Sequence, residues 1–166
     1  GNDAFYECSS LEIVEIDSSS SVATIGSNAF SKCASLKEFS IPSSVTIIEP
    51  NTFNGCSSLS QVSIPEGVTE FGESAFFECL QLAEISIPTS VTKIGSNAFY
   101  GCSFTQVLVP SSVIAIGENA FKNCHKLKQI ELPSSVYSRS IGIPFGFKVK
   151  VIKNKYYSQI IIIKYL

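Results

Sequence analysis

The chain has 166 residues, 45% of them hydrophobic and 16% charged, a composition that favours a packed core over disorder for most of its length. Residues 1–136 contain six lysines and all 14 acidic residues, whereas residues 137–166 contain five lysines, one arginine and no acid. The resulting net charges of −8 and +6 make the longer part a poor candidate for binding nucleic acid. No apolar run approaches the roughly 20 residues that a membrane helix needs, so we expect no membrane insertion.

A repeat of 22–25 residues runs through residues 1–136. Its markers are six cysteines, spaced 25, 23, 23, 23 and 22 residues apart, each three places after a phenylalanine. These pairs are Phe5 and Cys8, Phe30 and Cys33, Phe53 and Cys56, Phe76 and Cys79, Phe99 and Cys102, and Phe121 and Cys124. Self-similarity at this period predicts a solenoid, in which each unit packs mainly on its neighbours. Because residues 1–5 align with residues 26–30, we expect the chain to open within a repeat and to be a fragment of a longer protein.

Each unit predicts a short strand followed by a return segment, as one unit illustrates. The alternation in Ile85–Ile87 predicts a strand with its apolar side chains inward, and the proline that follows cannot donate a ladder hydrogen bond and ends it. The apolar pair Val91 and Ile94 returns the chain along another side of the coil. After a corner at Gly95, residues 96–99 predict a short helical turn with serine or asparagine near its start. Strands of successive units should lie parallel and in register, about 4.7–4.9 Å apart.

The end of the chain departs from this pattern, and we assign residues 137–166 to a degenerate repeat and a C-terminal cap or tail. Residues 141–147 look like a decayed corner and residues 149–151 like a decayed strand. Terminal repeats of solenoids are commonly atypical, because they shield the last face of the core. The run Ile160–Ile163 would be an aggregation hazard if it were left unpaired.

The six cysteines are predicted to be reduced and structural. Six cysteines in a short secreted chain normally indicate three disulfides, but these share one inward-facing phase beside phenylalanine, where cysteine behaves as a small hydrophobic residue. Neighbouring Cβ atoms would lie about 4.8 Å apart, beyond the roughly 3.5–4.5 Å that a disulfide prefers. No two cysteines have the spacing of zinc ligands, so we expect no metal site.

The sequence offers no catalytic constellation. His125 is the only histidine, and it occupies a variable turn position that serine, alanine or leucine fills in other units. Without a second histidine, a nucleophile–base pair would need a lysine or a carboxylate as the base. The glycines recur singly rather than in a phosphate-binding loop, and the acidic residues are dispersed. We therefore expect neither an enzyme nor a bound cofactor.

The recurring elements I-P-x-S-V and I-G-x-x-A-F-x-x-C resemble the BspA-type subclass of leucine-rich repeats, a family of surface proteins in bacteria and unicellular eukaryotic parasites. The resemblance covers residues 1–136. It implies an α/β-type repeat solenoid: a right-handed coil of mostly β structure and turns, with one parallel sheet and short strands, turns or helical turns opposite it. It also implies a cell-surface or secreted protein that binds host cells or extracellular-matrix proteins.

On the leucine-rich-repeat model, the residues between the inward apolar positions face the concave side of the coil. One such row is Ile13, Glu38, Gln61, Glu84, Gln106 and Gln129, and the adjacent row is Glu15, Ser40, Ser63, Ser86, Leu108 and Glu131. These rows form a ribbon of small polar side chains, carboxylates and glutamines, which is either a flat protein-binding surface or only a soluble sheet face. They lack the tryptophan, tyrosine and arginine anchors that dominate most hot spots, so we expect low affinity at a single site, which repetition could raise through multivalency.

Three functional classes are compatible with these features. The first is a protein-interaction module of a cell-surface protein, with a host extracellular-matrix or cell-surface protein as its partner. The second is a non-adhesive structural spacer or an intracellular scaffold, and the third is an accessory domain of a hydrolase. We favour the first, and we expect the two rows of exposed strand residues to carry the binding. A fold of this kind hosts many partners and does not decide between the classes by itself.

Overall fold

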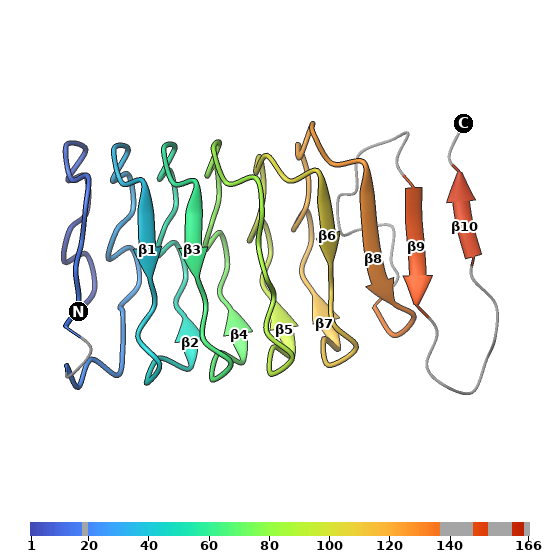
Figure 1. Cartoon of the computed structure of the whole chain (residues 1–166), viewed down its shortest axis with the longest axis horizontal. Helices are drawn as coiled ribbons and strands as arrows, with labels where there is room; N and C mark the ends of the chain where they lie inside the picture. Colours follow the sequence, from blue (N-terminus) through green and yellow to red (C-terminus); the bar gives the residue numbers. More distant parts are fainter. Residues whose placement is uncertain (18–19, 137–147, 153–160, 165–166) are drawn as a thin grey trace.

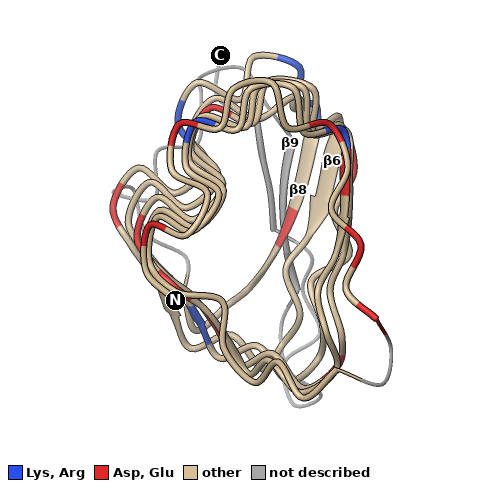
Figure 2. Ribbon diagram, turned by 90° about the vertical axis from the view of Figure 1, so that its left-hand side faces the viewer, with Lys and Arg blue, Asp and Glu red and all other residues tan. Residues whose placement is uncertain are grey.

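The computed structural model describes residues 1–17, 20–136, 148–152 and 161–164. Successive units form coils that are stacked in chain order along one axis, from the N-terminus to the C-terminal strands (Figure 1). Viewed along that axis, the coils superimpose as a ring (Figure 2). The described residues form short strands and turns without a helix, which confirms the expected solenoid of β structure and turns.

One side of the coils carries six short strands among the described residues, and all but the last lie in segments that the sequence predicts as strands. They are β1 (Glu38–Ser40), β3 (Gln61–Ser63), β6 (Gln106–Leu108), β8 (Gln129–Pro133), β9 (Lys148–Ile152) and β10 (Ile161–Lys164). β1 pairs with β3, and β6, β8 and β9 pair in that order, all parallel and in the predicted register. The strand expected at residues 149–151 is therefore present as β9. β10 adds to β9 in antiparallel orientation and pairs residues 161–163 of the isoleucine run.

This sheet is not continuous, because two coils lack a strand at this position. The segment Ile13–Asp17 lies beside β1 without a ladder, and residues 84–86 interrupt the series between β3 and β6. Both segments keep the alternation of inward and outward side chains: Val14 and Ile85 are half-buried, whereas their polar neighbours are exposed.

The return side of the coils carries a second parallel sheet. Its strands are β2 (Ile47–Ile48), β4 (Glu70–Phe71), β5 (Lys93–Ile94) and β7 (Ala115–Ile116). They pair in chain order, and each places an exposed or half-buried residue before an inward apolar one. The short strands expected opposite the main sheet thus form a ladder of their own.

The third side of each coil is a turn, so the prediction of a short helical turn there is wrong. Asn97 has φ 55° and Gly101 has φ 75°, and equivalent positive values recur in the other coils. Asparagine and glycine tolerate this left-handed conformation. Because of this conformation, alternate N–H groups point toward the next coil. The N–H groups of Asn97, Phe99 and Gly101 donate to its carbonyl groups at 2.9 Å each. A helix would have used those amides internally.

The core is built from the predicted phenylalanine and cysteine rows. The rings of Phe53, Phe76 and Phe99 are buried and stacked, with centroids 5.3 Å and 5.6 Å apart and interplanar angles of 9° and 10°. All the cysteines are buried except Cys8, which is exposed. The prediction of six inward thiols is therefore wrong for Cys8, whose coil has a described neighbour on one side only.

Candidate functional site

The candidate site is the strand face, which we define as the outer surface of the segment 13–15, β1, β3, residues 84–86, β6 and β8. The register places the two predicted rows side by side, with Glu38 opposite Gln61 and Ser40 opposite Ser63 in one pair of strands. Gln129 and Glu131 are half-buried, and the other residues of the two rows are exposed. The outward positions expected from the alternation are thus accessible along most of the face.

The rows extend one strand further than the sequence indicated. In the pairing of β8 with β9, Lys148 takes the register position beside Gln129, and Lys150 takes the position beside Glu131. This step is 19 residues long rather than 22–25, so the period of the array misses it. The alternation of lysine and valine at residues 148–151 is the sequence signal that predicts a strand here.

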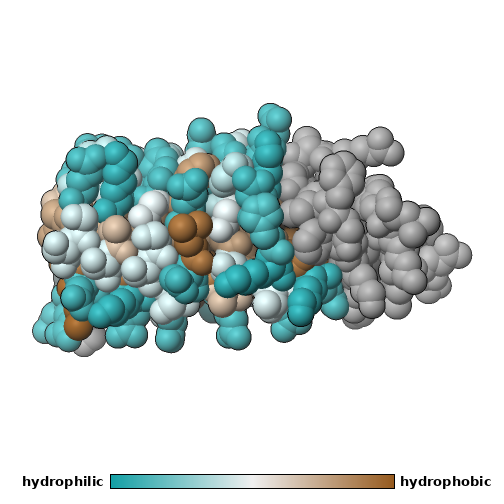
Figure 3. All heavy atoms as spheres, turned by 90° about the horizontal axis from the view of Figure 1, so that it is seen from above, coloured by the Kyte–Doolittle hydropathy of each residue, from teal (hydrophilic) through white to brown (hydrophobic). Residues whose placement is uncertain are grey.

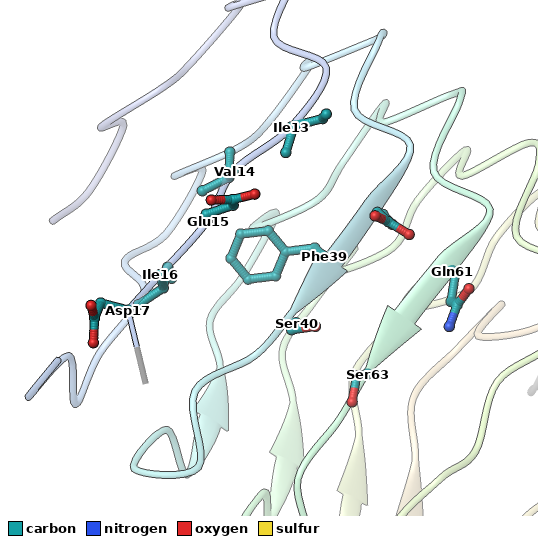
Figure 4. Close-up of a pocket in the computed structure, with 10 residues that line it drawn as sticks. Ile13, Val14, Glu15, Ile16, Asp17, Phe39, Ser40, Gln61 and Ser63 are labelled. Carbon is teal, nitrogen blue, oxygen red and sulfur yellow. The ribbon is translucent and has the colours of Figure 1, made fainter. Parts of the chain in front are cut away.

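An open groove, the first groove, lies where the ladder is missing between Ile13–Asp17 and β1. It has a volume of about 620 Å³ and is lined by that segment, by Glu38, Phe39 and Ser40 of β1, and by Gln61 and Ser63 of β3. Figure 4 shows the Phe39 ring between the segment and β1, below the side chains of Ile13 and Glu15. Phe39 itself is only 3% exposed, so the accessible lining is mainly polar.

A second groove lies at the other break in the ladder. It has a volume of about 420 Å³ and is lined by Ser60, Gln61 and Val62 on one side and by residues 83–86 on the other. Both grooves therefore lie at places where the strand ladder is missing. Neither groove could be predicted from the sequence, since alternation indicates which way a side chain points but not how one coil pairs with the next.

The strand face is acidic. Figure 2 shows Asp and Glu residues along the side of the ring that carries β6 and β8. The lining of the first groove includes Glu15, Asp17 and Glu38 and no lysine or arginine. The ion pairs among the described residues join Lys32 to Glu7, Lys37 to Glu12 and Lys93 to Glu70, and so leave Glu15, Glu38 and Glu84 unused.

The repeat that builds this face matches a family model, the BspA-type leucine-rich-repeat region, with six copies over residues 1–105 and 92–143. The chain belongs to the BspA-type leucine-rich-repeat family. This confirms the resemblance drawn from the I-P-x-S-V and I-G-x-x-A-F-x-x-C elements. Leucine-rich-repeat modules of this kind are scaffolds that generally mediate protein interaction.

Solved structures of bacterial leucine-rich-repeat proteins are similar to this one. A leucine-rich-repeat protein of T. pallidum is 37% identical with a TM-score of 0.66, over 71% of this chain and 55% of that one. One from Bacteroides ovatus is 34% identical with a TM-score of 0.66, over 75% of this chain and 32% of that one. The pneumococcal vaccine antigen PcpA, 22% identical with a TM-score of 0.57 over 69% and 36% of the two chains, shares the fold.

The chain therefore spans about half or less of the length of these solved proteins. Among curated proteins, none matches it. In the part of the chain that the structure describes, no helix has the length and apolar character needed to cross a membrane.

The buried thiols of this BspA-type array are structural. Desolvation by burial raises the pKa of the Cys56 and Cys124 thiols to about 12 and that of Cys33 to about 11, and it raises the pKa of Cys79 and Cys102 well above the usual value. Thiols held protonated in this way are poor nucleophiles, because the thiolate is the reactive form.

A metal centre and a histidine site are the other candidates among the described residues. Among them, no group of three or more histidine, cysteine or acidic side chains could hold a metal ion. His125 is exposed at its turn position. The view of the molecule from above, in Figure 3, shows a mostly hydrophilic surface with scattered hydrophobic residues rather than one large apolar patch.

Proposed function

We propose that this chain is a protein-interaction module of a cell-surface or secreted protein, that it binds host cells or extracellular-matrix proteins, and that its strand face is the binding surface. The single observation that supports this most is the accessibility of the two rows: ten outward side chains from five successive coils are exposed and lie on one side of the array. Surface location and host binding rest on the membership of the BspA-type family.

The geometry suits a broad and shallow contact. The two grooves lie on the same face and share Gln61 in their linings. The exposed apolar side chains of the rows are Ile13 and Leu108, which are 63% and 58% exposed and lie far apart in the array. A partner would therefore meet mainly hydroxyl, amide and carboxylate groups, whose hydrogen bonds give specificity more than affinity.

The decisive test places bulky cations on the face. The triple variant Ser40→Arg, Ser63→Arg and Ser86→Arg changes three exposed serines of one row. Its matched control is Ser43→Arg, Ser111→Arg and Ser134→Arg, which adds the same charge at exposed serines in the turns after the strands. Binding of both variants and the parent chain to a panel of extracellular-matrix proteins and to host cells is measured, with thermal unfolding as the check on folding.

We expect saturable binding of the parent chain and of the control, and loss of binding in the strand-face variant while it remains folded. Equal loss of binding in both triple variants would mean that the contact lies elsewhere or that binding depends only on the net charge of the chain. Binding by none of the three proteins would favour the alternative function, a non-adhesive structural spacer. Antibody labelling of intact cells that express the full-length protein tests the surface location separately.

A further inference from the structure

The first groove differs from the rest of the strand face in the groups it brings together. Ile13 contributes an exposed apolar side chain, and Glu15 and Glu38 contribute exposed carboxylates from the two sides of the break. Ser40 and Ser63 add hydroxyl groups along β1 and β3. One concave site therefore offers an apolar wall, negative charge and hydrogen-bond acceptors.

Glu15 and Glu38 are the carboxylates of the groove that the described ion pairs do not use. The lining of the groove includes no lysine or arginine. The three lysines that do form ion pairs contact acidic residues of the preceding coil outside the groove. The side chains of Glu15 and Glu38 are exposed, so an external cation could reach them.

Lysine and arginine side chains match this combination of groups. Each has an apolar stem that can cover a hydrophobic surface while its charged head contacts carboxylates. A divalent ion is a poorer match, because no cluster of three or more ligating side chains forms among the described residues. The net charge of −8 over residues 1–136 would also steer a basic partner toward the array.

We propose that the first groove binds a lysine or arginine side chain of an extended basic segment in a partner protein. This inference rests on the proposed function, because it specifies the chemistry of a partner on the same strand face. The cationic head lies between Glu15 and Glu38, and the stem lies against Ile13. Exposed pairs of this kind are individually weak, so the segment needs more than one basic residue.

The second groove sets the spacing of the next basic residue. It contains Glu84 and lies two coils further along the axis, about 10 Å away at the spacing of parallel strands. Three residues of a polyproline II segment span about 9.3 Å and return to the same face. A peptide with lysine at every third position between prolines can therefore reach both grooves, which makes it a suitable probe.

The experiment measures the affinity of a fluorescent peptide of four Lys-Pro-Pro repeats by anisotropy, beside a Gln-Pro-Pro peptide of the same length. The test variant is Glu15→Gln with Glu38→Gln. Its matched control is Glu73→Gln with Glu118→Gln, which removes the same charge at exposed residues on the return side. Thermal unfolding confirms that both variants remain folded, and titrations at about 50 mM and about 300 mM salt separate local contacts from diffuse attraction.

We expect the lysine peptide to bind more tightly than the glutamine peptide. The groove variant should weaken that binding about tenfold, and the control less than about twofold. Equal weakening by both variants, or equal affinity for both peptides, would overturn the inference. The proposed function would survive that result if a protein partner were still lost in the Ser40, Ser63 and Ser86 variant, so the two failures are distinguishable.

Discussion

The thiol of Cys79 donates a hydrogen bond to the backbone carbonyl of Phe53 in the preceding coil, with sulfur and oxygen 3.2 Å apart. The same carbonyl also accepts the N–H of Cys56 in its own coil, at 3.2 Å. The relationship recurs at every buried cysteine, with thiol-to-carbonyl distances of 3.0–3.3 Å. The cysteine row is thus a ladder of hydrogen bonds between coils, and it gives each of these carbonyl oxygens a second hydrogen-bond donor.

Replacing one rung of this ladder should destabilise the array. Cys79→Ala removes the S–H donor and buried volume together, and we expect a loss of about 1–2 kcal/mol in the free energy of unfolding. Urea denaturation measures it, with Cys8→Ala as the control, because Cys8 is exposed and its removal should change stability by less than about 0.5 kcal/mol. Equal effects of the two substitutions would show that the thiol ladder does not contribute.

The same thiols should make stability depend on alkaline pH. In the folded state Cys56 has a pKa of about 12, whereas an unfolded cysteine has one of about 8.5. The folded chain therefore holds more protons than the unfolded chain between these two pH values. The contribution of the buried thiol to stability is complete below about pH 8.5 and is lost as the pH rises toward 12.

Cys79→Ala provides the measurement of this dependence. Each buried thiol contributes up to about 1.4 kcal/mol per pH unit to the fall of the unfolding free energy with rising pH. Between about pH 9.5 and 10.5, the unfolding free energy of the variant should therefore fall about 1 kcal/mol per pH unit less than that of the parent chain. Parallel slopes for the variant and the parent chain would contradict the proton linkage.

Much of the fold could be predicted from the sequence because the repeat fixes positions that recur in every coil. The phase of Phe76 and Cys79 indicated the buried rows, and the alternation around Ser63 and Ser86 indicated which side chains point outward. In a stack of equivalent coils these assignments transfer from one unit to the next, so one period determines the register of the rest.

The features that escaped prediction depend on geometry between coils or on ambiguous residues. Asparagine is common at the start of a helical turn, which is why Asn97 predicts one, but it also favours the left-handed conformation that it adopts here, with φ 55°. The breaks in the ladder at residues 13–17 and 84–86 concern the pairing between coils, which alternation within one coil does not encode. The first groove, and with it the juxtaposition of Glu15 and Glu38, follows from such a break.

The phenylalanine ladder should carry a large part of the stability. Phe76 is fully buried, stacks on Phe53 and Phe99, and meets Phe71 edge-on with ring centroids 6.0 Å apart. We expect Phe76→Ala to cost about 3–5 kcal/mol in chemical denaturation, because it leaves a cavity that both neighbouring coils line. Phe5→Ala is the control, since Phe5 is 41% exposed and stacks on one ring only. A cost below about 1 kcal/mol for Phe76→Ala would contradict this placement.

The corner glycines set how closely the coils approach on the return side. A Cβ atom at Gly95 would lie 2.6 Å from the backbone nitrogen of Glu73 and 2.6 Å from the carbonyl carbon of Gly72. Because both atoms belong to the backbone of the preceding coil, no side chain can move aside, and Gly95→Ala should cost at least about 1–3 kcal/mol. Gly67→Ala is the matched control, since its Cβ would meet the Ser43 carbonyl oxygen at 3.4 Å, an ordinary contact. Similar denaturation midpoints for the two variants would mean that the coils can move apart at this corner to accept a side chain.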